Sequence, residues 1–364
     1  MNNNYYCIIM AGGTGLRFWP LARNGKPKQF LDLFGTGKTF LQSTYDRFAH
    51  FIPKENILVV TVAKYKKLVE DQLPQLNSEN LLLEPYSRNT APCIAYSTYS
   101  ILKRNPNAVM VITPSDHLIS DEDLFSKSVL DAMDYATKNE VLMTLGIVPD
   151  KPDTSYGYIQ VQGGEGAHSK DKPIKMKTFT EKPDAALAEV FYKSGEFFWN
   201  SGIYIWQAHT ISEELEKFSP EITGLFKGWD VALGSASEQV FLERAYTDCA
   251  KISIDYAVME KTGRAWVYPA RFKWSDIDTW ESIYKNFPEK DGKGTAVRCY
   301  KKISDGNKGD LIISSGKKKL VAVSGLENYV VIDTDDVLLI CPRDDKKIKE
   351  FTAGLGMPDF DEFR

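Results

Sequence analysis

The sequence lacks most features that mark a secreted, membrane-bound or nucleic-acid-binding protein. Its 364 residues include five cysteines and four histidines, scattered without a C-x-x-C pair or a metal-ligand spacing. This favours reduced thiols over a disulfide framework and gives no pattern for a His/Cys metal centre. No apolar run approaches a membrane span, no signal peptide begins the chain, and at a net charge of −4 no basic block tracks nucleic acid. We expect a cytoplasmic protein with no nucleic-acid or membrane partner.

The first 150 residues alternate short β-branched runs with longer amphipathic segments. The runs predict strands at Tyr5–Met10, Ile57–Thr61, Leu81–Glu84, Val109–Thr113 and Val141–Gly146. The amphipathic segments predict helices at Phe40–Phe51, Lys64–Leu73, Ala91–Lys103 and Asp121–Lys138. This alternation is typical of an α/β fold with a Rossmann-like, mostly parallel mixed sheet flanked by helices. Ligands of such sheets gather at the carboxyl ends of the strands.

The pattern changes further along the chain. Strands, aromatic residues and helices interleave from residue 154 to 280, and Val/Ile-rich strands separated by Gly and Asp turns follow Phe287. These strands are expected at Leu311–Ser314, Leu320–Val323, Tyr329–Asp333 and Val337–Cys341, with a final helix over Asp344–Leu355. We predict one domain over residues 1–290 and a small β domain, coiled as a short β-helix, over residues 291–364. Its strand edges need cover, which favours a homodimer through this domain.

A glycine-rich segment follows the first predicted strand. Residues 11–30 read AGGTGLRFWPLARNGKPKQF and contain Gly12, Gly13 and Gly15, then Arg17 and Lys28. Glycines let backbone N–H groups approach a phosphate, and the two cations supply the charge that a triphosphate needs. An ordinary strand-to-loop turn explains the glycines about equally well, so both interpretations stay open at this point.

Two familiar phosphate motifs do not fit the segment. The dinucleotide fingerprint needs a third glycine where Phe18 stands, and Pro20 soon interrupts the helix that should follow. The GTGKT of residues 35–39 imitates the end of a Walker A motif, but Asp32 stands where its first glycine belongs. A nicotinamide cofactor and a P-loop are therefore both disfavoured.

Two acids are candidates for a metal site. Asp116 follows the apolar run VMVIT, and Asp276 lies in WSDIDTW. Carboxylates beside a phosphate cradle suit Mg²⁺, which takes its remaining oxygens from phosphate and water. Either acid alone is more often a turn cap or a surface residue, so the assignment depends on the surrounding motifs. We expect His117 to be structural or to lie outside the metal's own ligands.

Two further motifs suggest sugar recognition. Glu181 and Lys182 follow a strand-like TFT, and Asn200 follows Trp199 ahead of an apolar strand. Glu and Asn beside an aromatic residue are typical partners of sugar hydroxyls, and Lys182 could meet a sugar phosphate as a compact charge. Gly157 lies in a turn whose backbone could touch a ligand. Each motif alone is more often an ordinary loop than a site.

Together these motifs resemble those of the mannose-1-phosphate guanylyltransferases, also called GDP-mannose pyrophosphorylases, in the sugar nucleotidyltransferase superfamily. The resemblance spans nearly the whole chain and rests on AGGTGLRFWPLAR, PKQF, EPYSRNTAP, PSDH, TSYGYI, TEKPD, WNSGIY, SIDYAVMEK and WSDIDTW in the family's order. One such motif is weak, whereas the collinear set is highly specific. It implies a nucleotide-diphospho-sugar transferase fold with a short C-terminal left-handed β-helix. It also implies Mg²⁺-dependent transfer of GMP from GTP to α-D-mannose 1-phosphate, giving GDP-mannose and pyrophosphate.

The resemblance also implies roles for single residues. Nucleotide binding is assigned to Ala11, Gly12, Gly13, Gly15, Arg17, Lys28, Glu84, Arg88 and Asn89. Sugar-phosphate binding is assigned to Gly157, Glu181, Lys182 and Asn200, and metal binding to Asp116 and Asp276. Catalysis is assigned to Arg17, Lys28 and Asp116.

Two residues depart from the family pattern. Asp278 stands where the family usually carries glycine in its W-S-D-x-G motif, and Ser155 replaces a glycine before Tyr156. Asp278 could crowd the metal, add a third acid to it or point to solvent. We expect it to point to solvent, because Asp276 fits the motif better.

Other functions stay open beside the implied one. The same chemistry on another sugar 1-phosphate, such as a fucose or heptose phosphate, would use the same motifs. A non-catalytic nucleotide-sugar-binding protein would keep the fold without turnover, but the intact set of Arg17, Lys28, Asp116 and Asp276 argues against it. No isomerase domain of the kind fused in longer relatives is evident, so we expect a single activity.

Overall fold

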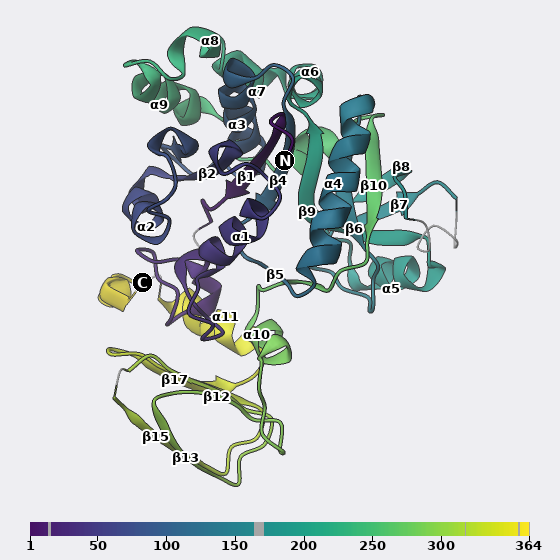
Figure 1. The fold of residues 1–364 in the computed structure, drawn as a ribbon. Coiled ribbons are helices and arrows are strands. Elements are labelled where there is room, and N and C mark those ends of the chain that lie inside the picture. The colour runs from purple at the N-terminus through teal and green to yellow at the C-terminus, as the bar shows by residue number, and fades with distance from the viewer. Residues whose placement is uncertain (14–15, 164–170, 317, 356, 364) are drawn as a thin grey trace. The chain divides into compact units, whose positions relative to one another are not determined.

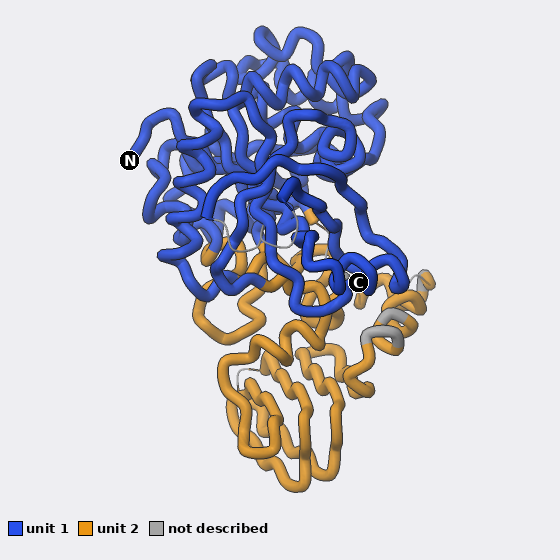
Figure 2. The backbone as a smooth tube through the Cα atoms, turned by 90° about the vertical axis from the view of Figure 1, so that its right-hand side faces the viewer, with its two compact units in different colours: residues 1–12, 44–115, 119–274 blue, residues 13–43, 116–118, 275–364 orange. Residues whose placement is uncertain are grey.

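The computed structural model describes residues 1–13, 16–163, 171–316, 318–355 and 357–363. The chain divides into two compact units, coloured separately in Figure 2. Unit 1 comprises residues 1–12, 44–115 and 119–274, and unit 2 comprises residues 13–43, 116–118 and 275–364. Unit 2 therefore includes most of the glycine-rich segment and Asp116 as well as the C-terminal part of the chain.

Unit 1 is built on a nine-stranded sheet with the order β3-β2-β1-β4-β9-β6-β10-β8-β7 (Figure 1). The strands β1 to β4 are Tyr5–Met10, Ile57–Val62, Leu81–Glu84 and Val109–Pro114. The strands β6 to β10 are Leu142–Ile147, Tyr158–Val161, Ile174–Thr180, Phe197–Gln207 and Ala265–Ala270. The parallel pairs are β3-β2-β1-β4 and β6-β10, while β9 runs antiparallel between β4 and β6. The predicted α/β fold with a mixed sheet is confirmed, and the expected strands form within one residue of their bounds.

Helices connect these strands. They are α1 (Phe40–Ala49), α2 (Lys66–Gln72), α3 (Thr90–Arg104), α4 (Glu122–Lys138), α5 (Ala185–Ser194), α6 (Ala208–Phe218), α7 (Pro220–Leu225), α8 (Trp229–Ala232) and α9 (Glu238–Asp248). The expected helix over residues 64–73 begins late, because Ala63–Tyr65 form a 3-10 turn. Asp121 begins α4 as its N-cap, with a side-chain oxygen that accepts the N–H of Leu124 at 3.1 Å. Within the described ranges, no helix has both the length and the apolar character that crossing a membrane requires.

Helices pack on both faces of the sheet, as predicted. Side chains alternate along β1, so Tyr6 and Ile8 face one side and Tyr5 faces the other. Tyr6 and Ile8 belong to the apolar cluster that includes Ala95 of α3. Tyr5 donates a hydrogen bond to Asp134 of α4, which lies beside β9 and β10 in Figure 1.

The carboxyl ends of several strands meet at one edge of the sheet. Met10 of β1 pairs with Val60 and Pro114, and Val62 pairs with Glu84. The turns after β1, β3 and β4 therefore leave from the same edge, where ligands of parallel sheets gather. Downstream of β4 lies a short strand, β5 (His117–Ile119), which pairs with β11 (Trp274–Asp276).

The C-terminal part of unit 2 is a small coiled β structure. Its strands β12 to β17 are Ala296–Arg298, Lys301–Asp305, Leu311–Ser314, Leu320–Ser324, Tyr329–Asp333 and Leu338–Pro342, with flanking helices α10 (Trp280–Asn286) and α11 (Asp345–Gly354). Strands β12-β14-β16 and β13-β15 form two parallel ladders, and β17 closes the first ladder antiparallel. Asp310 accepts the N–H of Tyr329, 19 residues on, at 2.7 Å, which ties successive coils together. Alternating parallel ladders are the pattern of a β-helix, as predicted.

An apolar core joins the glycine-rich segment of unit 2 to its coil. The rings of Phe18 and Trp280 are fully buried and meet edge to face, with centroids 5.2 Å apart. The same cluster includes Leu311 and Ile313 of β14. Aromatic pairs of this geometry add to the gain from burial. The residues around Arg17 and Lys28 are thereby anchored on α10 and on the first coils.

Candidate functional site

Lys28 and two acids of unit 2 meet in one cluster. Nζ of Lys28 lies 3.0 Å from Oδ2 of Asp116 and 3.8 Å from Oδ1 of Asp276. It also donates a hydrogen bond to the carbonyl of Ile277. The structure thus brings together three predicted site residues from three separate segments of the chain.

Local structure explains why these residues meet. Lys28 begins a single 3-10 turn, and its Nζ lies 5.7 Å from the centroid of the buried Phe18 ring. Asp116 comes directly before β5, and Asp276 ends β11, the strand with which β5 pairs. The strand pairing holds the two carboxylates near each other, and the packing on Phe18 holds the amino group against them.

Burial and charge oppose each other in this cluster. Burial of Lys28 would lower its pKa, but Asp116 and Asp276 more than offset burial and raise the pKa above its ordinary value. Burial would raise the pKa of Asp116, yet Lys28 and His117 hold it below its ordinary value. Lys28 and Asp116 are therefore both charged at neutral pH before any ligand binds.

His117 joins the two aspartates as a third possible metal ligand. One ring nitrogen of His117 and one oxygen each of Asp116 and Asp276 lie within 4.8 Å of one another. We expected His117 to be structural or to lie outside the metal's ligands, whereas the structure brings it into the candidate donor set. The only sequence signal for this was its position directly after Asp116.

This donor set fits a divalent cation. Mg²⁺ takes oxygen ligands and typically uses one or two carboxylates, which Asp116 and Asp276 can supply. Imidazole suits transition-metal ions better than Mg²⁺. The two aspartates alone therefore suit Mg²⁺, and the addition of His117 would extend the site to softer ions.

Asp278 does not point to solvent, so that expectation was wrong. Its Oδ2 lies 3.1 Å from Nη1 of Arg17, and its side chain is 18% exposed while that of Arg17 is 64% exposed. The backbone φ of residue 278 is not positive. Among the described non-glycine residues, a positive φ occurs at Asn89, Lys182 and Asn328. Asp278 therefore replaces the family's glycine without left-handed strain.

The start of the glycine-rich segment lies in unit 1, against a buried acid. Ala11 continues β1, and its N–H donates to the carbonyl of Val60 at 2.8 Å. A Cβ added to Gly12 would lie 3.1 Å from Oε2 of Glu84, closer than ordinary van der Waals contact. Glycine at this position therefore lets the Glu84 carboxyl approach the backbone of the segment.

The rest of the glycine-rich segment belongs to unit 2. The carbonyl of Gly13 accepts a hydrogen bond from Nε2 of Gln29 at 2.8 Å. A Cβ added to Gly13 would meet no other described atom within 4 Å, so the chain there is open to a ligand. Gly15 lies outside the described residues.

Glu84 is a buried acid at the carboxyl edge of the sheet. It is 4% exposed, and its Oε1 accepts a hydrogen bond of 3.0 Å from the hydroxyl of Tyr246. Burial raises the pKa of Glu84 to about 7, although the bond from Tyr246 opposes this. The carboxyl group therefore changes charge close to neutral pH.

Arg88 and Asn89 both make contacts within the fold. Nε and Nη2 of Arg88 donate to the carbonyls of Tyr246 and Thr247, at 2.9 and 3.0 Å, in the last turn of α9. Asn89 has a φ of 70°, and its Oδ1 accepts the N–H of Thr90 at the start of α3. These contacts give both residues a structural role, and their assignment to base and ribose remains a prediction.

Asn200 is held by a network of buried polar side chains in unit 1. Its Oδ1 accepts from Oγ1 of Thr144 at 2.8 Å. Its Nδ2 donates to Oη of Tyr204 at 3.1 Å and to Oδ1 of Asp255 at 3.0 Å. Burial raises the pKa of Asp255 to about 6, although the hydrogen bond from Tyr204 opposes this. The orientation of the Asn200 amide is therefore set by its surroundings.

Gly157 lies next to Asn200 and against Glu181. The carbonyl of Gly157 accepts the N–H of Asn200 at 2.8 Å. A Cβ at Gly157 would lie only 2.5 Å from Oε2 of Glu181, so no larger residue fits there without displacing the carboxylate. The other oxygen of Glu181 lies 2.6 Å from Nζ of Lys182. The four residues predicted for the sugar phosphate are thus brought together.

Sequence reasoning missed the residues that support these groups. Tyr204, Asp255 and Tyr246 were given no role, although the first two lie in or beside the motifs WNSGIY and SIDYAVMEK. Motif position could have drawn attention to Asp255, a buried acid in a π-helical turn, which is often found near functional sites. No sequence signal linked Tyr246 to Glu84.

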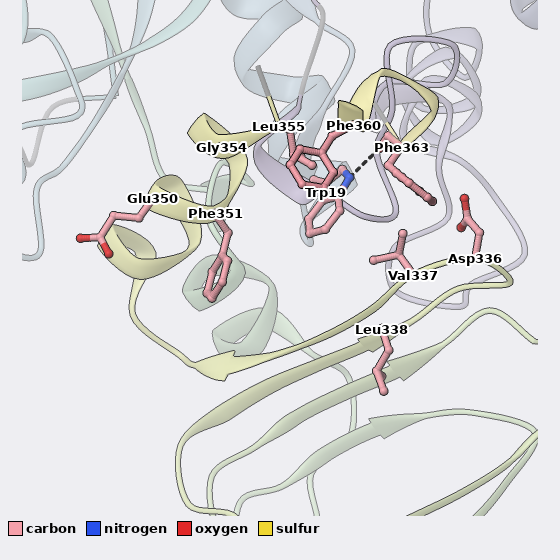
Figure 3. Close-up of a pocket in the computed structure, with 10 residues that line it drawn as sticks. All are labelled: Trp19, Asp336, Val337, Leu338, Glu350, Phe351, Gly354, Leu355, Phe360 and Phe363. Carbon is pink, nitrogen blue, oxygen red and sulfur yellow. Dashed lines mark hydrogen bonds between the residues drawn. The ribbon is translucent and has the colours of Figure 1, made fainter. Parts of the chain in front are cut away.

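Unit 2 also contains an apolar pocket of about 530 Å³, drawn in Figure 3. It is lined by Trp19, Asp336, Val337, Leu338, Glu350, Phe351, Gly354, Leu355, Phe360 and Phe363. The indole N–H of Trp19 donates to the carbonyl of Phe363 at 2.7 Å, which ties the end of the described chain to the pocket. None of the predicted site residues lines it.

Comparison with known families matches two parts of the chain. Residues 6–291 match the nucleotidyl transferase family, and residues 309–355 match the MannoseP isomerase/GMP-like beta-helix domain. The second match agrees with the coiled ladders of unit 2.

Several curated proteins are similar over most of this chain. The mannose-1-phosphate guanylyltransferases of Escherichia coli and Klebsiella pneumoniae are each 37% identical over 351 residues, which cover 94% of this chain and 73% of the relative. Xanthan biosynthesis protein XanB of Xanthomonas campestris is 37% identical over 356 residues, covering 95% of this chain and 72% of XanB.

Solved structures agree with these sequence matches. A Thermus thermophilus protein described as mannose-1-phosphate geranyltransferase superposes with a TM-score of 0.84 at 29% identity, covering 97% of this chain and 100% of that one. A Helicobacter pylori protein described as mannose-6-phosphate isomerase superposes with a TM-score of 0.61 at 30% identity, covering 75% of this chain and 100% of that one.

Proposed function

This chain belongs to the nucleotidyl transferase family, among the mannose-1-phosphate guanylyltransferases, and from that premise we propose its reaction. It transfers GMP from GTP to α-D-mannose 1-phosphate, giving GDP-mannose and pyrophosphate. Enzymes of this family act on a nucleoside triphosphate and a sugar 1-phosphate, and they generally use a divalent metal ion. The choice of GTP and mannose 1-phosphate rests on relatives at 37% identity that carry this name.

The observation that carries the proposal is the cluster of Lys28, Asp116 and Asp276. A lysine 3.0 Å from one carboxylate and 3.8 Å from another combines a phosphate-binding cation with two possible metal ligands. Phosphoryl transfer needs both, because the reacting phosphates repel each other. We propose that Asp116 and Asp276 hold Mg²⁺. When bound, the ion would screen phosphate charge and orient the two reactants.

The reaction needs positioning and charge more than acid–base chemistry. A phosphate oxygen of mannose 1-phosphate attacks the α-phosphorus of GTP, and pyrophosphate leaves from the opposite side. A phosphate monoester is already an anion near neutral pH, so no strong general base is required. Arg17 and Lys28 would bind the triphosphate and stabilise the charge that develops on the leaving pyrophosphate.

The remaining predicted residues are proposed for substrate binding. The nucleotide contacts are Ala11, Gly12, Gly13, Gly15, Glu84, Arg88 and Asn89, supported for Gly13 by its open surroundings. The sugar-phosphate contacts are Gly157, Glu181, Lys182 and Asn200, supported by their mutual contacts. Lys182 is the cation of this group, and its side chain is 61% exposed, so it can reach a phosphate.

A pyrophosphate-release assay tests the proposed reaction. The protein is offered GTP, ATP, UTP or dTTP with mannose, fucose or heptose 1-phosphate, with and without Mg²⁺. Release with GTP and mannose 1-phosphate alone is the expected result, and the Asp116→Asn variant should lose it. A preference for another sugar phosphate would redirect the assignment. Binding of GDP-mannose without pyrophosphate release would indicate a non-catalytic binding protein.

Three further predictions stay proposals. We propose a catalytic domain over residues 1–290 and a β domain over residues 291–364, supported by family matches that end at 291 and begin at 309. A homodimer through the β domain is supported by the exposure of its strand β13 and is testable by light scattering. We also propose a cytoplasmic location, supported by the GTP that the proposed reaction consumes.

A further inference from the structure

We propose that Asp278 competes with the incoming triphosphate for Arg17, so that this carboxylate sets how tightly the protein binds polyphosphates. The inference rests on the proposed function, in which Arg17 binds the triphosphate. Oδ2 of Asp278 lies 3.1 Å from Nη1 of Arg17. The Arg17 side chain is 64% exposed, so an anion from solvent can reach it while the pair is formed.

The contact is not a by-product of helix capping. Thr279, not Asp278, is the N-cap of α10, and its Oγ1 accepts the N–H of Ser282 at 3.0 Å. Oγ of Ser282 accepts the N–H of Thr279 in return at 3.1 Å, which completes a capping box. The Asp278 carboxylate is therefore not required to begin the helix.

Residues 276–278 supply a carboxylate to each of the two cations proposed to bind phosphate. Asp278 pairs with Arg17, and Asp276 lies 3.8 Å from the amino group of Lys28. Asp278 also contributes to the raised pKa of Lys28. Asp276 and Asp278 thus lie close to the two cations that a triphosphate would need.

A polyphosphate can displace the carboxylate, whereas a single phosphate competes less well. Guanidinium binds carboxylate and phosphate oxygens through the same fork of N–H donors, so the two anions compete for Arg17. A triphosphate that reaches both Arg17 and Lys28 gains from two cations. After transfer, the carboxylate can pair with Arg17 again, which favours release of pyrophosphate.

The test is equilibrium binding without metal. GTP and inorganic tripolyphosphate are titrated into the full chain in EDTA at fixed ionic strength. Asp278→Asn and Asp278→Gly should each bind both probes about 2- to 5-fold more tightly than the parent, the range expected for loss of one partly exposed ion pair. Asp305→Asn, an exposed acid on β13, is the matched control and should bind as the parent does. Thermal melts check that every variant is folded.

A double-mutant cycle identifies the cation involved. In an Arg17→Ala background, Asp278→Asn should change affinity less than 2-fold, because the pair no longer exists. An equal gain in both backgrounds, or no gain in the first, would overturn the proposal. Absence of binding of either probe to the parent would overturn it as well. Tripolyphosphate carries no base, so loss of GTP preference in the assay for the proposed function would leave this result intact.

Discussion

The hydroxyl of Tyr204 donates a hydrogen bond of 2.6 Å to Oδ1 of Asp255, and both side chains are buried. The same oxygen accepts from Nδ2 of Asn200 at 3.0 Å. Tyr204 therefore fixes the carboxylate that in turn orients Asn200, a residue proposed to bind the sugar phosphate. This network links packing inside unit 1 to the shape of the candidate sugar site.

Tyr204→Phe should weaken both stability and sugar binding. The change removes one donor from a buried carboxylate, which typically costs about 1–3 kcal/mol of unfolding free energy. Because Asn200 would lose one of the three side chains that orient it, KM for mannose 1-phosphate should rise about tenfold while kcat falls less. Urea denaturation and initial rates measure the two effects. Tyr192→Phe, on the surface of α5, is the control, and an equal response from it would remove Tyr204 from the proposed role.

This network also marks the limit of what the sequence could predict. Lys28 was identified from the glycine-rich segment, Asp116 from the end of an apolar run, and Asp276 from its place in the motif WSDIDTW. Tyr204 and Asp255 act through a contact between residues 51 apart, and no periodicity or spacing reports such a contact. Strands β1 to β4 and β6 were predictable for a similar reason, since each carries its own apolar run, whereas no bounds were predicted for β7, β8 and β10.

Asp278 and strand β9 also show what the sequence could and could not predict. The position of Asp278 as a departure from the family pattern was visible in the sequence, but the direction of its side chain was not. The direction depends on Arg17, which reaches it from a separate segment of the chain. Antiparallel β9 between β4 and β6 was likewise not predictable, because a buried strand has the same apolar composition in either direction.

Gly157→Ala should displace Glu181. The added Cβ would lie 2.5 Å from Oε2 of Glu181 and 2.9 Å from Cζ of Phe179, so the carboxylate or the ring must move. We expect KM for mannose 1-phosphate to rise at least about tenfold, with KM for GTP changed less. The matched control is Gly224→Ala, where a Cβ would meet no described atom within 4 Å. Equal KM values for the two variants would remove Gly157 and Glu181 from the sugar site.

Glu84 should make the stability of the protein depend on pH. Its pKa is raised to about 7 in the folded state, against about 4.3 for an unperturbed glutamate in an unfolded chain. Between these values the folded state binds a proton that the unfolded state does not. The stabilisation is therefore present at low pH and is lost as pH rises through about 7. The shift corresponds to about 3 kcal/mol between pH 4 and pH 8.

The Glu84→Gln variant isolates this contribution. Its unfolding free energy, measured in urea from pH 4 to 8, should fall less steeply with pH than that of the parent. Asp255, with a pKa of about 6, contributes a slope of the same sign in both proteins, so the difference between them reports Glu84. Glu79→Gln, an exposed acid, should keep the parent slope. Parallel curves for all three proteins would show that Glu84 ionises normally.

Lys28→Ala tests whether the cluster of unit 2 performs the chemistry. The amino group lies 3.0 Å from Asp116. Its removal takes away a positive charge proposed to bind phosphate, and it leaves the carboxylates of Asp116 and Asp276 without their neighbouring cation. Loss of one such electrostatic group typically lowers the rate about 10²- to 10³-fold, and we expect this loss in kcat/KM for GTP. The variant should also melt at a lower temperature in EDTA, because the acids then repel each other. Added Mg²⁺ should raise the melting temperature of the variant by more than it raises that of the parent.

Lys26→Ala, two residues away and exposed, controls for the loss of a positive charge in the same loop. A kcat/KM within a few-fold of the parent would exclude Lys28 from catalysis, and a melting temperature unaffected by Mg²⁺ would exclude the two aspartates from the metal site.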